Sequence, residues 1–349
     1  MFDVENIMRE NILRLKPYSS ARDEFKGDAS VFLDANENSY GSPLPESYNR
    51  YPDPLQKELK EKISSIKGVP HQNIFLGNGS DEAIDVLFRI FCEPKTDNVI
   101  ICPPTYGMYE VSANINDVEV RKVNLLPSFD LDVERILESC GEHSKLLFIC
   151  SPNNPTANSF HAEDMELLIQ KFPGIVVIDE AYINYSKQKS AIRFLTEYEN
   201  LVVLQTFSKA WGLAAIRLGM AFAPQIITEY MNKVKPPYNI NLATQQFAMK
   251  ALDNIDWVNR HILETIEERK KLEQQLITTS LIEKMYPSDA NFILVKVKDA
   301  QGIYNYLVSL GIIVRDRSRI ILCEDCLRIT IGTESENRAL LTALNKFEL

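Results

Sequence analysis

Hydrophobic residues recur along the first two thirds of the chain in short unbroken runs, many of them rich in valine and isoleucine. Helical or loop segments separate each run from the next. Unbroken apolar runs of this kind are typical of strands that are buried on both faces of a parallel sheet. The pattern therefore predicts an α/β fold with a mainly parallel, helix-flanked sheet. The runs occupy residues 99–102, 146–150, 175–178, 201–204 and 220–223.

Two of the intervening segments carry the signals of a helix start or end. Asp53 and Pro54 precede a helical pattern that stops at Gly68, and Ser80 precedes an amphipathic run over residues 83–91. Proline fits the first helical turn, serine caps helix starts, and glycine commonly follows the last turn. Helices therefore alternate with the strands, as an α/β fold requires.

The hydrophobic pattern changes near residues 240–250. A long helical pattern with mixed charges runs from about 241 to 279, and a smaller α/β unit follows it. We therefore predict a large domain of residues 36–248 and a small domain made of residues 1–35 and 249–349. The first 35 residues are too few to fold alone, and we expect them to pack against the C-terminal part. Apolar or helical runs at 292–297, 300–310, 312–314, 320–322 and 327–331 indicate the small unit.

The composition is that of an ordinary globular protein, with 349 residues of which 45% are hydrophobic and 25% charged. The 48 acidic residues exceed the 38 basic ones, which gives a net charge of −10. Such a surface repels phosphate backbones, so we expect no nucleic-acid partner. An anionic substrate would need a few local arginines to bind it.

The chain carries no signal of membrane insertion or export. Its apolar stretches are far shorter than the ~18 residues that span a bilayer, and Asp3, Glu5 and Arg9 interrupt any signal-peptide core. The six cysteines suit buried, reduced thiols, so we expect a cytoplasmic protein. Cys323 and Cys326 form one close pair, but no second pair or histidine pair accompanies them. We therefore expect no metal site.

Polar residues follow several of the predicted strands directly. Asp179 follows the run at 175–178, Lys209 follows the run at 201–204, and Asn154 follows the run at 146–150. Ligands of open α/β sheets bind at the carboxyl ends of the strands, so we expect these side chains to converge. Taken singly, each is more often a turn, cap or surface residue. The combination is what indicates a site.

Eight sequence blocks carry a resemblance to a known family. They are SPNNPT at 151–156, DEAY at 179–182, SKAWGL at 208–213, RLG at 217–219, DANEN at 34–38, RYPD at 50–53, CPPTYGMY at 102–109 and LRITIG at 327–332. The first four, in this order and spacing, resemble the fold-type-I pyridoxal-phosphate-dependent aminotransferases, and the other four also resemble members of this family. The resemblance implies a seven-stranded type of sheet in the large domain and pyridoxal 5'-phosphate as the cofactor.

For the cofactor ring, the resemblance implies the roles of five residues. Lys209 is the catalytic residue, because its primary amine forms the imine bond with the cofactor aldehyde. Once substrate displaces it, the amine carries a proton from the substrate Cα to C4′ of the cofactor. Asp179 faces the pyridine nitrogen and keeps it protonated. Asn154 and Tyr182 hydrogen-bond the 3-oxygen, and Tyr106 stacks on the ring face.

For the cofactor phosphate, the resemblance implies a further group of residues. Ser208, Arg217 and the backbone N–H groups of Ser80 and Asp81 at a helix start supply hydrogen bonds and positive charge. The side chains of Asp81 and Glu82 oppose an anion by charge, but they can point away so that the amides bind the phosphate. Tyr51 reaches the phosphate from a second subunit, which implies a homodimer with shared active sites.

The implied reaction is a ping-pong transamination between L-histidinol phosphate and 2-oxoglutarate, which gives imidazole-acetol phosphate and L-glutamate in histidine biosynthesis. Arg328 binds the carboxylate of glutamate and the phosphate of histidinol phosphate, with Arg315 as its partner on the phosphate. Asn36 is a candidate for the carboxylate side and Tyr18 for the imidazole.

Other functions on the same scaffold stay open at this point. An aromatic-amino-acid aminotransferase and a phospho-amino-acid decarboxylase use the same electron-withdrawing chemistry, and the arginine pair does not choose between transfer and decarboxylation. A transcription regulator with an aminotransferase-like domain is disfavoured, because the residues before Asn36 are too few for a helix-turn-helix module.

Three positions depart from the family pattern. Ala157 and Ala215 stand where glycine is commoner, and Ser39 stands where proline is commoner. Alanine is strained at any position that needs a positive φ. Either the turn differs slightly at these two positions, or they do not need a positive φ.

Overall fold

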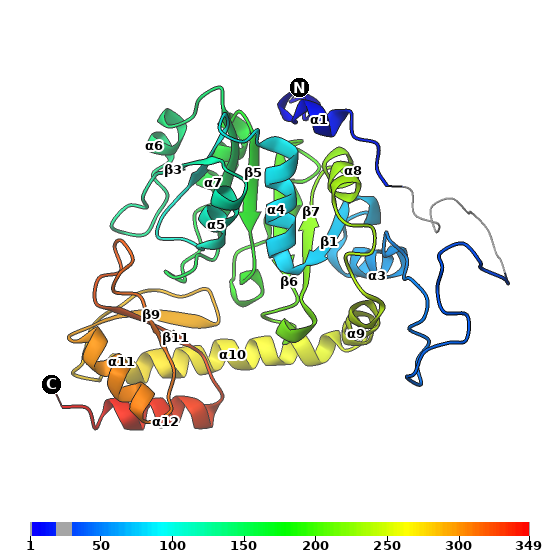
Figure 1. Ribbon diagram of the computed structural model, residues 1–349. Coiled ribbons are helices and arrows are strands. Elements are labelled where there is room, and N and C mark those ends of the chain that lie inside the picture. The colour runs from blue at the N-terminus through cyan, green and yellow to red at the C-terminus, as the bar shows by residue number, and fades with distance from the viewer. Residues whose placement is uncertain (1, 19–29, 349) are drawn as a thin grey trace.

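The unbroken apolar runs form the central strands of a seven-stranded sheet in the computed structural model, which describes residues 2–18 and 30–348 (Figure 1). The strand order is β1-β7-β6-β5-β4-β2-β3, and β7 alone runs antiparallel to its neighbours. The predicted α/β fold with a mainly parallel sheet is confirmed. The strands are β1 (Ile74–Asn78), β2 (Asn98–Ile101), β3 (Glu119–Lys122), β4 (Ser144–Cys150), β5 (Ile175–Asp179), β6 (Leu201–Thr206) and β7 (Leu218–Phe222).

Helices cover both faces of this sheet. In β5, Val176 and Ile178 join the buried cluster on one face, while Ile175 and Val177 join the cluster on the other. Every position of a central strand is thus buried, which is why its sequence shows no polar alternation. The helices are α3 (Lys57–Lys67), α4 (Gly79–Phe91), α5 (Met108–Ile115), α6 (Val133–Glu138), α7 (Ala162–Lys171), α8 (Gln225–Val234) and α9 (Leu242–Leu252).

A smaller antiparallel sheet in the order β10-β11-β9-β8 follows the long helix α10 (Ile255–Leu276) and has its own buried cluster. Residues 320–322, one of the predicted apolar runs, lie in a turn. Within residues 2–18 and 30–348, none of the helices combines the length and apolarity needed to cross a membrane. The other elements are β8 (Ile282–Met285), β9 (Phe292–Val297), α11 (Ala300–Ser309), β10 (Arg315–Asp316), β11 (Cys326–Thr330) and α12 (Glu334–Leu344).

The N-terminal segment packs against the large domain, and not against the C-terminal part as the sequence led us to expect. Val4, Met8 and Ile12 are spaced four residues apart and are buried in the cluster that α4 and α8 build. Lys233 of α8 also donates hydrogen bonds to the carbonyls of Ile12 and Leu13. The expectation was therefore wrong for residues 2–18, because their buried apolar side chains belong to the cluster that covers this face of the large sheet. The short helix α1 (Glu10–Leu13) lies near the ends of α4 and α8 (Figure 1).

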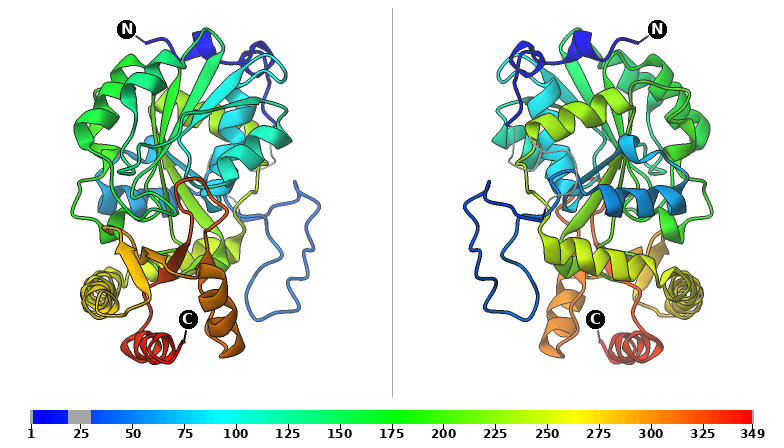
Figure 2. Two further views of the ribbon diagram at one scale, coloured as in Figure 1. Left: turned by 90° about the vertical axis from the view of Figure 1, so that its left-hand side faces the viewer. Right: turned by 90° about the vertical axis from the view of Figure 1, so that its right-hand side faces the viewer.

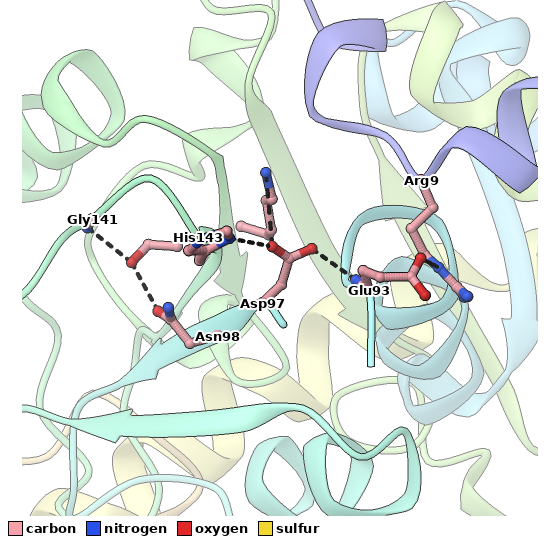
Figure 3. A network of polar contacts seen from close by, with 8 residues as sticks. Arg9, Glu93, Asp97, Asn98, Gly141 and His143 are labelled. Atoms are coloured by element: carbon pink, nitrogen blue, oxygen red, sulfur yellow. Dashed lines mark hydrogen bonds and ion pairs between the residues drawn. The ribbon is translucent and has the colours of Figure 1, made fainter. Parts of the chain in front are cut away.

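A polar network fixes this segment at the amino-terminal edge of the sheet (Figure 3). The Nε of Arg9 donates to Glu93 at 2.9 Å, and the backbone N–H of Glu93 donates to Asp97 at 2.7 Å. Asp97 in turn lies 3.3 Å from Nδ1 of His143, just before β4. These contacts fix the starts of β2 and β4. They therefore lie at the edge of the sheet opposite the carboxyl-terminal ends of the parallel strands.

The two alanines that replace family glycines adopt different backbone conformations. Ala157 has a φ of 70°, a left-handed conformation that costs an L-residue about 1–2 kcal/mol. It is fully buried, and its carbonyl accepts a hydrogen bond from Asp289 at 2.8 Å. Ala215 lies in the short helix η5 (Ala214–Ile216) and has no positive φ. Of the two alanines, only Ala157 is strained. Its burial and its hydrogen bond with Asp289 stabilise the left-handed conformation.

Gly219 allows β7 to lie directly against the start of α4. A Cβ at this position would come within 2.1 Å of the Ser80 backbone nitrogen. We expect Gly219→Ala to lower the free energy of unfolding by about 1–3 kcal/mol, because neither backbone can move aside. Gly107→Ala is the matched control, since a Cβ there meets no atom within 4 Å, and it should cost under about 0.5 kcal/mol. Urea unfolding measures both, and equal stabilities of the two variants would contradict this account.

Candidate active site

The carboxyl-terminal ends of the central strands enclose a cavity. Asp179 ends β5, Lys209 follows β6, Asn154 follows β4, and Ser80 opens α4 after β1. Crossovers in a parallel sheet bring these chain positions to the same edge. The cavity is lined by nine of the residues that the sequence predicts around the cofactor: Ser80, Asp81, Tyr106, Asn154, Asp179, Tyr182, Ser208, Lys209 and Arg217.

Asp179 is a buried carboxylate with two hydrogen-bond donors. The Tyr109 hydroxyl donates to its Oδ2 at 2.8 Å, and the Ala181 N–H donates to its Oδ1 at 3.0 Å. Burial nevertheless raises the pKa of Asp179 to about 6, although both hydrogen bonds and the nearby Lys209 lower it. The carboxylate is therefore held in place with its charge incompletely compensated, which suits a cationic ligand group.

Tyr109 is a residue of the site that the sequence analysis missed. It lies in the first turn of α5, is fully buried, and stacks on Phe148 of β4 with ring centroids 4.7 Å apart. Its ring also meets Tyr106 edge-on at 5.6 Å. The available signal was its position three residues after Tyr106, which puts both tyrosines on one side of the chain. A buried aromatic at helical spacing otherwise looks like an ordinary core residue.

Lys209 projects its amine into the cavity, with Nζ 5.5 Å from the centroid of the Tyr182 ring. Partial burial, followed by the charge of Arg328, lowers the pKa of Lys209 below its ordinary value, while Asp179 opposes that shift. A lower pKa raises the fraction of neutral amine near pH 7. A neutral amine is what nucleophilic attack or proton abstraction needs.

An anion cradle forms between the start of α4 and Arg217. The first N–H groups of an α-helix have no partner within the helix, so those of Ser80 and Asp81 can donate to a ligand. Gly79 has a φ of 71°, and a Cβ there would come within 2.7 Å of the Arg217 guanidinium. The absence of a side chain at Gly79 therefore lets the arginine reach the amides.

The two acids at this helix start behave differently. Glu82 turns back to accept from the Asn78 N–H at 2.5 Å, away from the cavity. Asp81 faces the cavity instead, where its carboxylate pairs with Arg217 at 3.1 Å and accepts from Tyr106 at 3.0 Å. The expectation that the side chains point away thus holds for Glu82 and not for Asp81.

Arg328 brings the small sheet to the mouth of the cavity. Its guanidinium donates to the Asn154 side-chain oxygen and lies 5.1 Å from the centroid of the Phe292 ring. The Asn154 amide lies 3.5 Å from the Tyr182 hydroxyl. Burial, followed by repulsion from Arg317, lowers the pKa of Arg328 to about 10. Arg317 was not among the residues that the sequence analysis selected.

The remaining predicted site residues do not line this cavity. Arg315 is exposed on β10, opposite Arg328 in the ladder. Tyr51 stacks on Tyr238 at 4.4 Å, in a depression that it shares with Asn36. Tyr18 is 73% exposed on another face. A single chain therefore does not bring Tyr51, Asn36 or Tyr18 to the Lys209 cavity.

The chemistry of the cavity suits a phosphate-bearing aromatic cofactor such as pyridoxal phosphate. A cradle of amides and a guanidinium, which a Cβ at Gly79 would obstruct, lies at one end. A buried carboxylate, Asp179, and an amine with a lowered pKa, Lys209, lie in the same cavity. The residues present therefore fit the group that the sequence resemblance implies.

Comparison with known proteins agrees with this geometry. Residues 32–344 match the sequence model of the family described as aminotransferase class I and II. The chain is 54% identical over 349 residues to the histidinol-phosphate aminotransferase of Bacteroides thetaiotaomicron, with 100% of both chains covered. It is 52% identical over 346 residues to the histidinol-phosphate aminotransferase of Cytophaga hutchinsonii, with 99% of each covered.

A solved structure has the same fold. The histidinol-phosphate aminotransferase from Sinorhizobium meliloti, in complex with pyridoxal-5'-phosphate, superposes with a TM-score of 0.79 at 23% identity, and 89% of each chain is covered. At this identity the likeness supports the architecture of the two sheets.

The raised pKa of Asp179 predicts a pH-dependent stability of the ligand-free protein. Because the native state holds the proton up to about pH 6 and the unfolded state only to about pH 4, stability falls as pH rises through this window. The contribution is about 3 kcal/mol. Asp179→Asn removes it while keeping an oxygen that accepts from Tyr109. We therefore expect the variant to lose less stability than the wild type between pH 4 and 7 in urea unfolding; parallel pH profiles would contradict the assignment.

Proposed function

Because the chain belongs to the class I and II aminotransferase family, we propose that it is a pyridoxal-phosphate-dependent histidinol-phosphate aminotransferase. It converts L-histidinol phosphate and 2-oxoglutarate to imidazole-acetol phosphate and L-glutamate, a step of histidine biosynthesis. The observation that carries the proposal is the convergence of Lys209, Asp179 and the Arg217 cradle in one cavity of a chain whose full length matches such enzymes.

Pyridoxal phosphate supplies, when bound, an aldehyde that condenses with amines and a ring that withdraws electrons from the substrate Cα. Arg217, Ser208 and the amides of Ser80 and Asp81 hold its phosphate. Asp179 presents its carboxylate to the pyridine nitrogen, and Tyr109 keeps that carboxylate oriented.

Three further side chains surround the cofactor ring. Tyr182 and Asn154, whose polar groups lie 3.5 Å apart, donate to the 3-oxygen. Tyr106 covers one face of the ring, as the sequence resemblance implies. Its hydroxyl is fixed by Asp81 at 3.0 Å, so the ring has one defined orientation.

Lys209 carries the proton that leaves the substrate Cα during the reaction. Its lowered pKa leaves more of the amine neutral, so that Nζ can accept a proton from the substrate Cα. The positive charges of Arg328 and Arg217 favour the neutral form, and Asp179 limits the shift. The same atom would then deliver this proton to C4′ of the bound cofactor, so the transfer needs no external base.

The anionic ends of the substrates are bound by the small domain. Arg328 faces the cavity and binds either the distal carboxylate of glutamate or the phosphate of histidinol phosphate. Arg315, opposite it on β10, adds a second positive charge at the entrance. Local arginines thereby overcome the net charge of −10 of the whole chain.

The substrate assignment is tested by supplying purified, cofactor-loaded protein with 2-oxoglutarate and either histidinol phosphate or phenylalanine. We expect glutamate to form much faster from histidinol phosphate, and Lys209→Ala to reduce this rate by about 10²–10⁴-fold or more. Comparable turnover of phenylalanine would identify an aromatic aminotransferase instead. Loss of histidinol phosphate without glutamate formation would identify a decarboxylase.

We further propose a homodimer with shared active sites, and a cytoplasmic location. Residues 30–56 contain no helix or strand and run out from the body of the chain (Figure 2). Val31, Leu33 and Tyr40 on this segment are at least 70% exposed, which suits burial against a second copy. Tyr51 lies outside the cavity of its own chain and contacts the partner's cofactor phosphate. The six free cysteines suit a reducing compartment.

Shared sites predict complementation between two inactive variants. Lys209→Ala chains lack the amine, and Tyr51→Ala chains lack the tyrosine supplied to the partner. After mixing and subunit exchange, each heterodimer has one site with both residues, so about a quarter of all sites are intact. We expect the mixture to exceed the summed activity of the separate variants. Activity equal to that sum, with exchange verified by mass, would contradict shared sites.

A further inference from the structure

The turn after β10 places a third arginine beside Arg315 and Arg328. The N–H of Arg317 donates to the Cys326 carbonyl at 2.9 Å, which continues the ladder that pairs Arg315 with Arg328. Residues two apart on a strand face the same side, so the three arginines share one face of the small sheet. That face points toward Tyr182, because both Arg328 and Arg317 act electrostatically on its hydroxyl.

This cluster of positive charge has no carboxylate partner in the described part of the chain. Arg328 donates to Asn154, and Arg317 makes no side-chain hydrogen bond or ion pair among the residues described. Burial lowers the pKa of both guanidinium groups, and a neighbouring positive charge adds to this effect: Arg315 acts on Arg317, and Arg317 acts on Arg328. Like charges that are brought together and partly buried are stabilised when an anion binds between them.

Buried polar atoms without a hydrogen-bond partner also indicate that an anion binds at this cluster. Five buried side-chain polar atoms in the described residues lack a hydrogen-bond partner, and three of them lie here: the Nε atoms of Arg317 and Arg328 and the Oγ of Ser318. A buried donor on a charged group is costly when left unpaired. Their concentration in one place indicates acceptor oxygens of a ligand rather than scattered local defects.

We propose that Arg317 is a substrate-binding residue that acts with Arg328 on the phosphate group of the phosphorylated substrate and makes the site prefer phosphate to carboxylate. This rests on the proposed function above. A phosphate monoester carries a charge of about −1.5 to −2 and three acceptor oxygens near pH 7. A carboxylate carries a single charge, and one arginine satisfies both of its oxygens. The second guanidinium, that of Arg317, therefore acts mainly on the phosphorylated substrate.

The test measures the two half-reactions of the holoenzyme separately, one with histidinol phosphate and one with glutamate. We expect Arg317→Gln to raise the KM for histidinol phosphate about ten- to a hundredfold, with a change of less than about threefold in kcat and in the KM for glutamate. Arg317→Lys should recover part of the affinity, since it restores the charge without the planar fork. Arg319→Gln is the matched control, because Arg319 lies exposed in the same turn.

Inorganic phosphate gives a second readout that does not depend on the identity of the organic substrate. It should inhibit the glutamate half-reaction competitively, and Arg317→Gln should raise its inhibition constant about tenfold or more. If the wild type fails to turn over histidinol phosphate, the proposed function is wrong, and this inhibition still tests Arg317. Equal losses on glutamate and the phosphorylated substrate, unchanged phosphate inhibition, or a lowered Tm with no change in KM would overturn the proposal.

Discussion

A carboxylate buried at the end of β5 is the constraint on which the rest of the site depends. Asp179 is 3% exposed, and the hydrogen bonds from Tyr109 and Ala181 do not offset its burial, since its pKa is still raised to about 6. An uncompensated carboxylate in this position is unfavourable unless a cationic group binds beside it. The core of the large domain maintains this arrangement, because Tyr109 is held by its stacking on Phe148. The stability of the ligand-free protein is thus lowered at a position that suits a cationic ligand group.

The two sheets divide the chemistry between them. The large sheet supplies Lys209, Asp179 and the Arg217 cradle, whereas the small sheet supplies Arg328 and Arg317 at the mouth. The two parts meet directly where Tyr182 packs edge-on against Phe292 with ring centroids 5.1 Å apart. Under the proposed function, a substrate bound between the sheets has its reacting carbon near Lys209 and its anionic end near Arg328. Any shift of the small sheet relative to the large one would change the distance between Lys209 and Arg328.

The unbroken apolar runs were sufficient to predict the central strands, and the residues that follow them were sufficient to predict that Asp179, Lys209 and Asn154 meet at one edge of the sheet. Tyr106 and Arg217 were selected from the family resemblance. Tyr109 could not be selected in this way, because its role depends on a buried contact with Asp179 that has no signature in sequence spacing. Arg317 belongs to a charged stretch that looks like a solvated turn until the ladder places it beside Arg328. The edge strands β3 and β8 contain adjacent charged residues, so hydrophobicity alone does not reveal them. The domain limits near residues 240–250 stay a prediction.

The central claim is that Lys209, among all the lysines, bonds covalently to the cofactor. Protein loaded with pyridoxal phosphate would be reduced with borohydride, which makes the lysine–cofactor bond permanent, and digested for peptide mapping by mass spectrometry. The account predicts the label on Lys209, and much weaker labelling in the Asp179→Asn variant. Lys60 and Lys67 are the informative competitors, because burial also lowers the pKa of each, that of Lys60 to about 7. Label on either of them, or none on Lys209, would contradict the account.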